Sequence, residues 1–251
     1  MLQLIRHATL LLQLHGQRFL IDPFLGDRNA YPPIPQAGND IPIPMLDLPL
    51  PPAQIQSLLI AADAVIVTHL HRDHWDDAAK ALISKDKLLL TQPESIALLQ
   101  AQGYTNVQDV QGTKLGAVQL FRTSGQHGTG AVGQRMGAVS GVIFKTPEMT
   151  VYLAGDTIWC PEVAAAITLY QPDYIIVNAG AAQFLEGGPI TMTAEDILAV
   201  TQAAPQAHVI AVHMDTVNHC FLTREILREY LLEQDLVEQV LVPDDGEEIV
   251  L

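Results

Sequence analysis

The sequence predicts an α/β fold, and three observations support this prediction. From residue 52 onward, short apolar runs rich in strand-forming residues alternate with longer segments that carry helix start and stop signals. Several of the apolar runs end in a histidine or an aspartate. The chain has 251 residues, of which 49% are hydrophobic and 16% are charged, so it is long enough to bury a large core.

The N-terminal part of the chain is predicted to form strands and then a long loop. Residues 1–7 form the first expected strand, and residues 10–14 and 18–21 flank His15-Gly16 as a hairpin, in which we expect His15 to have no chemical role. A Pro-rich loop follows at about residues 24–52, and its prolines exclude a helix or a central strand. Loops this long are usually functional or disordered, so an ordered lip over a site and a flexible flap are equally favoured.

Helices and strands alternate through the rest of the chain. Prolines, acidic residues or the capping box Thr193-Ala-Glu-Asp196 mark the helix starts, and the expected helices are 53–61, 76–84, 93–102, 161–170, 193–203 and 223–234. The expected strands are 64–68, 88–91, 118–123, 138–145, 150–154, 174–178, 208–212 and two short ones near 237–242 and 248–251. No linker, close repeat or low-complexity tract divides the chain, so we expect a single domain over residues 1–251.

A dense group of potential metal ligands follows the strand at 64–68. His69 and His71 are two residues apart, so in extended conformation their imidazoles project from the same side, and Asp73 and His74 follow on the turn. Three imidazoles and a carboxylate at a strand end are costly unless something satisfies them. Clustered His and Asp side chains therefore predict a site for Zn²⁺ or a similar ion, with a geometry that suits two adjacent ions.

Three further apolar runs each end in one potential ligand, namely His127, Asp156 and His213. Taken singly these are weak signals, because a Gly-Asp-Thr sequence such as the one around Asp156 is more often a turn. Cys160 and Cys220 lie in no C-x-x-C motif, and we expect both to be ordinary buried thiols and not ligands.

The order of these motifs, H-x-H-x-D-H, a lone His, Gly-Asp and a lone His, resembles the metallo-β-lactamase fold hydrolases over nearly the whole chain. The resemblance implies a four-layer αββα sandwich, in which two mixed β-sheets pack face to face with helices outside. It also implies two groups of ligands with Asp156 as a bridge between the ions: His69, His71 and His127 for the first ion, and Asp73, His74 and His213 for the second.

A narrower resemblance rests on Ile5-Arg-His-Ala-Thr9 and Phe19-Leu-Ile-Asp-Pro-Phe24. These segments are similar to the subgroup that includes L-ascorbate-6-phosphate lactonase and the N-acyl-phosphatidylethanolamine phospholipase D-like hydrolases. Within it, Asp22 is expected to orient the metal loop by hydrogen bonding, and a plain strand-terminating aspartate is an equal alternative. His7 could line the site as an acid or a substrate contact, and a buried structural histidine is slightly favoured.

The function that the resemblance implies is metal-dependent hydrolysis. A hydroxide bridging two divalent ions would attack a small-molecule lactone, ester, amide or phosphoester, with Asp73, Asp156 and His7 as candidate catalytic residues. A thiolate-free donor set suits Zn²⁺ first, and Mn²⁺ or Fe²⁺ as well. Flavodiiron relatives carry an acidic residue where His71 stands, which argues against redox chemistry. The alternatives are a non-catalytic metal-dependent sensor and an RNA-processing nuclease.

Composition limits the classes of molecule that the protein is expected to bind. The formal net charge of −15 argues against nucleic acid, although a small, anionic substrate could still bind at the metals. No apolar stretch is long enough for a membrane span and the N-terminus does not resemble a signal peptide, so we expect a cytoplasmic protein. The loop at 24–52 suits a homo-oligomer contact as well as a lid. Residues 178–183 and 214–219 are candidates for shaping the pocket, and a turn and a helix entry explain them equally.

Overall fold

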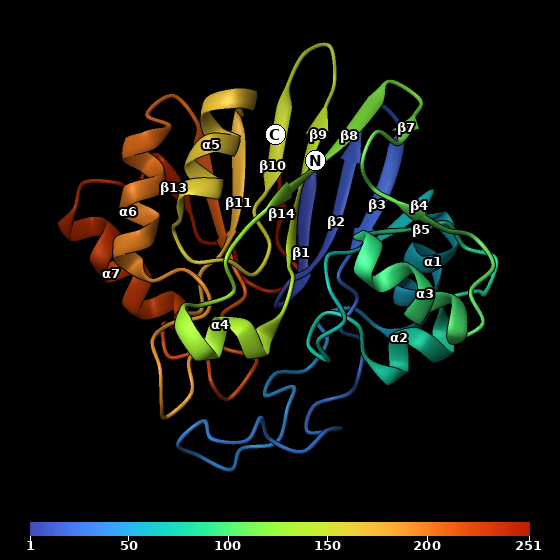
Figure 1. Ribbon diagram of the computed structural model, residues 1–251, viewed down its shortest axis with the longest axis horizontal. Coiled ribbons are helices and arrows are strands. Elements are labelled where there is room, and N and C mark those ends of the chain that lie inside the picture. The colour runs from blue at the N-terminus through green and yellow to red at the C-terminus, as the bar shows by residue number, and fades with distance from the viewer.

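Two seven-stranded β-sheets pack face to face in the computed structural model, which describes residues 1–251, and helices cover both outer faces (Figure 1). This is the four-layer αββα arrangement of two mixed sheets, so the predicted fold class is confirmed. No helix is long and apolar enough to cross a membrane. The cytoplasmic location stays a prediction.

The first sheet contains the N-terminal strands. Its order is β14 (Glu248–Ile249), β1 (Leu2–Arg6), β2 (Thr9–Leu14), β3 (Gln17–Ile21), β4 (Ala64–Val67), β5 (Leu89–Thr91) and β6 (Val107–Asp109). The strands from β14 to β3 pair antiparallel, and those from β3 to β6 pair parallel. The hairpin expected between β2 and β3 is present, and its turn has positive φ at both His15 and Gly16. The His15 side chain pairs with Glu148, away from any site.

The second sheet contains the central and C-terminal strands. Its order is β13 (Val240–Leu241), β12 (His208–Val212), β11 (Tyr174–Asn178), β10 (Thr150–Leu153), β9 (Ser140–Lys145), β8 (Val118–Ser124) and β7 (Lys114–Leu115). Strands β10 to β13 pair parallel, and β7 to β10 pair antiparallel. The parallel part brings the carboxyl ends of β10, β11 and β12 to one edge, where polar side chains follow each strand.

The helices that cover the sheets start where the sequence signals place them. Those on the first sheet are α1 (Pro52–Ala61), α2 (Asp77–Leu82) and α3 (Pro93–Ala101), and those on the second are α5 (Pro161–Tyr170), α6 (Ala194–Ala203) and α7 (Arg224–Glu233). Asp76 caps α2 by accepting a hydrogen bond from the Ala79 amide, which satisfies one free N–H of the first turn. The capping box between Thr193 and Asp196 is present at α6.

Apolar side chains from both sheets form the central core. Phe19 of β3 meets Phe144 of β9 edge to face, with ring centroids 5.2 Å apart, and both rings are fully buried. Two further apolar clusters lie between each sheet and its helices. Burial on both faces explains why the central strands are near-continuous runs of Val, Ile and Leu.

Three elements were not predicted: the short strands β6 and β7, and α4 (Gly130–Met136). Two glycines, Gly130 and Gly133, lie within α4, and glycine disfavours helix, so the sequence carries no helix signal there. This helix lies at the same end of the sandwich as the Pro-rich loop (Figure 1).

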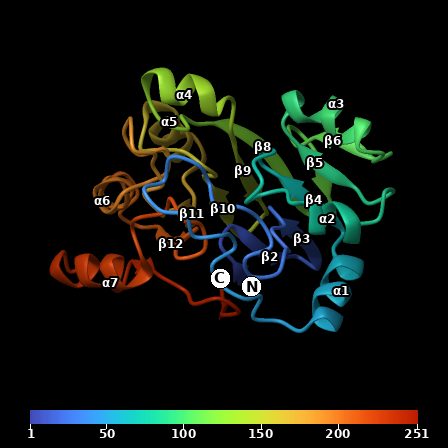
Figure 2. The same ribbon diagram turned by 90° about the horizontal axis from the view of Figure 1, so that it is seen from below.

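The Pro-rich loop packs across that end of the sandwich (Figure 2). The buried guanidinium of Arg6 donates hydrogen bonds to the carbonyls of Phe24, Gly26 and Leu46, and so ties both ends of the loop together. The middle of the loop is held by Asn218, which bonds both the amide and the carbonyl of Ile34. These contacts match the arrangement of an ordered lip.

Candidate metal centre

All seven expected ligands lie together at the end of the sandwich that carries the lip. They follow four different strands: β4 supplies residues 69–74, and β8, β10 and β12 are followed by His127, Asp156 and His213. Six of the seven are at most 6% exposed and His71 is half-buried. Buried polar side chains from distant parts of the chain therefore face one another in one small volume.

His69, His71 and His127 form one group of side chains that could hold an ion. Nε2 of His69 lies 2.9 Å from Nδ1 of His71, and Nε2 of His127 lies 3.3 Å from the same atom. Each of these nitrogens faces the other two, as ligands around a common cation do.

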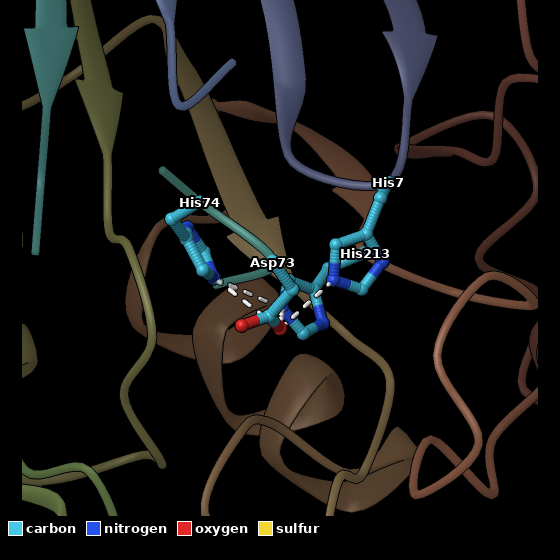
Figure 3. A group of neighbouring side chains, drawn as sticks. All are labelled: His7, Asp73, His74 and His213. Carbon is cyan, nitrogen blue, oxygen red and sulfur yellow. Dashed lines mark hydrogen bonds and ion pairs between the residues drawn. The ribbon is translucent and has the colours of Figure 1, made fainter. Parts of the chain in front are cut away.

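Asp73, His74 and His213 form a second group, which also includes His7 (Figure 3). Nε2 of His74 lies 3.2 Å from Nε2 of His213, and Oδ2 of Asp73 lies 3.5 Å from the latter atom. The carboxylate of Asp73 points toward all three imidazoles.

Asp156 lies between the two groups. Its Oδ2 is 3.6 Å from Nε2 of His127 and 3.2 Å from Nε2 of His74, and its Oδ1 is 3.4 Å from Nε2 of His213. Because its two oxygens face imidazoles of both groups, this carboxylate has the placement of a bridging ligand.

The donor set fits divalent ions. Two neutral imidazole nitrogens that face each other can share at most one proton, and here five imidazoles converge with their lone-pair atoms inward. Cations placed among them would satisfy nitrogens that otherwise repel. Nitrogen and carboxylate oxygen without thiolate are donors that Zn²⁺, Mn²⁺ and Fe²⁺ accept.

The outer nitrogens of these histidines are held by hydrogen bonds that fix the tautomer. Nδ1 of His74 bonds to Oδ2 of Asp22 at 2.8 Å, and Nδ1 of His127 bonds to the carbonyl of Ile190 at 2.8 Å. With the proton on Nδ1, the lone pair on Nε2 is left for a metal. Asp22 also accepts hydrogen bonds from the amide and the hydroxyl of Thr68, so it does orient the loop that begins there.

Backbone conformation also positions the carboxylate of Asp156. Gly155 has φ +72°, and a Cβ atom there would lie 2.7 Å from the carbonyl oxygen of Ser140, so only glycine fits. The amide of Asn178, at the end of the neighbouring strand β11, donates a hydrogen bond of 2.5 Å to Oδ1 of Asp156. Within the segment 178–183, Asn178 therefore orients a ligand.

His7 is the fully buried fourth member of the second group. Its Nε2 lies 3.2 Å from Oδ2 of Asp73, its ring lies against the tilted ring of His213 with 3.6 Å between centroids, and its carbonyl accepts a hydrogen bond from the His213 amide. Burial, aided by the neighbouring His213, lowers the pKa of His7 to about 3, so the ring is neutral. His7 does not line the pocket and contacts Asp73 instead.

The pKa values of the expected ligands favour the binding of cations. Burial alone would raise the pKa of Asp73 and Asp156, but nearby imidazoles outweigh it and hold the pKa of both carboxyls well below the usual range. Burial keeps the pKa of His69 and His127 below the ordinary value. His74 differs, because Asp156, Asp22 and Asp73 together overcome burial and raise its pKa well above that value. Ionised carboxylates beside the neutral imidazoles of His69 and His127 favour metal binding, and a metal ion bound at His74 would displace the second proton of its ring.

A pocket of about 460 Å³ opens onto the ligands. Four expected ligands form its floor: His71, Asp73, His127 and Asp156. Its walls come from the lip, from α4 and from the loops after β4, β11 and β12: Ile34, Pro35, Gln36, Arg72, Arg135, Met136, Phe184, Ile190 and His219. Of the segment 214–219 only His219 reaches the pocket, because Asp215 pairs with Arg224 and Thr216 is buried beneath the lip.

Several pocket residues were not predicted from the sequence. Arg135 and Met136 belong to α4, which carries no helix signal, and Phe184 lies in a loop. Arg72 lies inside the H-x-H-x-D-H motif, and its place between two ligands was a signal for a residue at the mouth of the site. Cys160 and Cys220 are free and buried, as expected, although Sγ of Cys220 lies 3.7 Å from Nδ1 of His213.

The fold and the grouped His and Asp side chains are those of a metal-dependent hydrolase with the metallo-β-lactamase fold. A family model described as the beta-lactamase superfamily domain matches residues 17–214. The UPF0173 protein YddR of Bacillus subtilis (strain 168) is 41% identical over 248 residues, which are 97% of this chain and 96% of that protein. A UPF0173 metal-dependent hydrolase of Pyrobaculum aerophilum is 28% identical over 220 residues, which are 84% of this chain and 82% of that protein.

Two solved structures of similar hydrolases have the same fold as this chain. The isothiocyanate hydrolase from Delia radicum gut bacteria superimposes with a TM-score of 0.94 at 37% identity, over 100% of this chain and 98% of that one. A possible metal-dependent hydrolase from Veillonella parvula DSM 2008 gives 0.95 at 37% identity, with the same coverage. The chain therefore belongs to the beta-lactamase superfamily and, within it, to the UPF0173 metal-dependent hydrolases. The narrower resemblance to the lactonase and phospholipase D-like subgroup stays a prediction.

Proposed function

We propose that the protein is a dinuclear hydrolase of small molecules. Its first ion would be held by His69, His71 and His127, its second by Asp73, His74 and His213, and Asp156 would bridge the two. The observation that carries the proposal is the position of Asp156, whose oxygens face imidazoles of both groups within 3.2–3.6 Å. Zn²⁺ suits this donor set best, and Mn²⁺ or Fe²⁺ also fit.

When bound, two such ions would supply a hydroxide nucleophile near neutral pH. They would also stabilise the negative charge that develops on the oxygen or sulfur of the substrate. The chain itself orients the ligands. Asp22 and Asn178 hold His74 and Asp156, and His7 holds the carboxylate of Asp73, so that the site is rigid before substrate arrives. We assign to Asp73 the additional role of holding the proton of the attacking nucleophile.

The pocket walls suggest a substrate with an apolar body. Ile34, Met136, Phe184 and Ile190 supply the apolar surface, and the volume of about 460 Å³ suits a small organic molecule. Lactones, esters, amides and phosphoesters remain in the proposed class. The similarity to the isothiocyanate hydrolase adds isothiocyanates, whose central carbon is also attacked by hydroxide to give an amine and carbonyl sulfide.

Two guanidinium groups at the mouth favour a negatively charged substituent on the substrate. Arg72 lies over the ring of Tyr31 and Arg135 over the ring of Phe184, at 5.2 and 4.8 Å from the ring centroids. Both are exposed and neither pairs with a carboxylate, although the chain has 28 acidic residues against 13 basic ones. Unpaired guanidiniums beside a metal centre are typical of anion recognition.

The proposal is tested with purified protein loaded with Zn²⁺ or Mn²⁺. A panel of lactones, esters, amides, phosphodiesters and aryl isothiocyanates is assayed, each with and without a carboxylate substituent. We expect turnover of at least one class, loss of turnover on chelation and recovery when the metal is returned. Full activity without metal would refute the proposal. Intact metal with no hydrolysis across the panel would favour a sensor, and tight binding of structured RNA at physiological salt would favour a nuclease.

A further inference from the structure

His219 is a buried histidine on the pocket wall whose polar atoms have no protein partner. The residue is 6% exposed, its Nδ1 is fully buried without a partner, and its Nε2 makes no hydrogen bond within the chain either. It lines the pocket together with Asp73 and Asp156 but belongs to neither group of expected ligands. A buried polar group without a partner costs about 1–3 kcal/mol, so such a group in a pocket wall indicates a ligand that completes it.

The backbone around His219 is held firmly, although its ring nitrogens are free. Asn218 clamps the lip through Ile34, and the carbonyl of His219 accepts the Gln183 amide at 3.0 Å. A β-bridge joins Cys220 to Ala182 on the other side. The His219 ring packs near the Phe184 ring, with 5.7 Å between centroids. The main chain on both sides of the ring is therefore held, and because no protein group accepts from the ring, its N–H is left for a bound molecule.

We propose that His219 is a catalytic residue that donates a hydrogen bond to the substrate atom on which negative charge develops. This inference rests on the proposed hydrolase function. As hydroxide adds to the electrophilic carbon, the electron pair of the C=O or C=S bond moves to the oxygen or sulfur, and the His219 N–H stabilises that atom. His219 keeps its proton throughout, so no acid is consumed.

The protonation state of the His219 ring suits a hydrogen-bond donor and not a general acid. Burial lowers the pKa of His219 to about 4, which leaves the imidazole neutral near pH 7 with one N–H. A neutral donor already placed in a buried wall needs little reorganisation when charge appears, and removing such a donor commonly slows turnover by about 100–1,000-fold.

The test compares His219→Gln, which keeps an N–H donor, with His219→Phe, which keeps the ring and loses it. His208→Phe is the matched control, because His208 is exposed at the start of β12, at the other end of the strand from His213. Each variant is loaded with Zn²⁺ and its metal content is measured. We expect His219→Phe to lose about 100-fold in kcat with little change in KM, and His219→Gln to recover much of the loss. Unchanged kcat in His219→Phe, or loss of kcat only together with metal, would overturn the inference.

A binding measurement separates this inference from the proposed function. Phenylphosphonate has a tetrahedral anion and an aryl body, and its affinity for each Zn²⁺-loaded protein is measured by calorimetry. We expect His219→Phe to bind it at least about 10-fold more weakly than the parent, which corresponds to one lost hydrogen bond to a charged group. Equal affinities would remove His219 from the substrate site. If His219→Phe binds phenylphosphonate more weakly than the parent but the parent hydrolyses no substrate, the contact of His219 with the ligand stands and the proposed hydrolase function is rejected.

Discussion

Oδ2 of Asp22 accepts a hydrogen bond from Nδ1 of His74 at 2.8 Å, although the two residues are 52 positions apart. The contact exists because β3 and β4 are neighbouring parallel strands, which end at the same edge of the sheet. It places the proton of His74 on Nδ1 and turns Nε2 toward His213 and Asp156. The buried carboxylate of Asp22 thus sets the orientation of His74, although Asp22 is not itself one of the expected metal ligands.

Replacing Asp22 by Asn should weaken metal binding. The amide keeps the size of the carboxylate but loses its charge, and loss of such a partner commonly costs about 10–100-fold in metal affinity. Competition with a chromophoric chelator measures the change. Asp63→Asn is the control, because Asp63 is an exposed aspartate that accepts only the Arg18 amide. Equal affinities for the two variants would show that Asp22 has no part in the metal centre.

Gly155→Ala should displace Asp156. The new Cβ atom would lie 2.7 Å from the Ser140 carbonyl, so the backbone before the bridging carboxylate must move. Gly112→Ala is a matched control, since φ is +77° there and nothing lies within 4 Å of the added atom. Both variants carry the strain of a positive φ, about 1 kcal/mol or more, and only Gly155→Ala should also lose metal. Elemental analysis that found full occupancy in both would contradict this assignment.

Arg135→Gln should change selectivity more than turnover. Removing the guanidinium over Phe184 leaves the metal groups intact but removes one cation from the pocket mouth. We expect KM to rise about 10-fold for a substrate with a carboxylate substituent and to change little for its neutral analogue, because one charge-assisted hydrogen bond contributes about 1.5–3 kcal/mol. Arg18→Gln, on the distant strand β3, controls for net charge. Equal KM changes for the two substrates would argue against anion recognition.

The stability of the metal-free protein should depend on His219 in acid. The unfolded chain protonates this residue below its ordinary pKa of 6.5, whereas the folded protein does so only below about 4. The unfolded state therefore binds more protons between these values, and the free energy of unfolding falls as pH falls. His219→Gln removes one such proton, which should flatten the slope by up to about 1.4 kcal/mol per pH unit. Urea denaturation at pH 4 to 7 measures it, and parallel curves would show that the ring titrates normally.

The sequence predicted the parts of the site that depend on local spacing. His69, His71, Asp73 and His74 lie within six residues after one strand, so the chain itself keeps them together. The pairs Asp22–His74 and Asn178–Asp156 depend on which strands are neighbours in a sheet. Sequence alone left the first open, and for the second it suggested only that the segment after β11 shapes the pocket.

The pocket walls were the least predictable part. Arg135 comes from α4, where two glycines remove the helix signal, and for His219 the sequence indicated only the segment 214–219. The Pro-rich loop was predicted, with an ordered lip and a flexible flap equally favoured. Its ordered packing depends on Arg6 and Asn218, whose bonds to it span 18 to 184 positions of sequence. Contacts of that range follow from the assembled fold and not from local pattern.

Metal stoichiometry tests the dinuclear assignment most directly. Metal-free protein is titrated with Zn²⁺, and bound metal and turnover are measured on the same samples. Two ions per chain are predicted, with turnover appearing as the second site fills, and Asp156→Asn should lower the affinity of both sites because its carboxylate faces both groups. A single ion per chain at full activity, or activity that is independent of metal, would contradict the account.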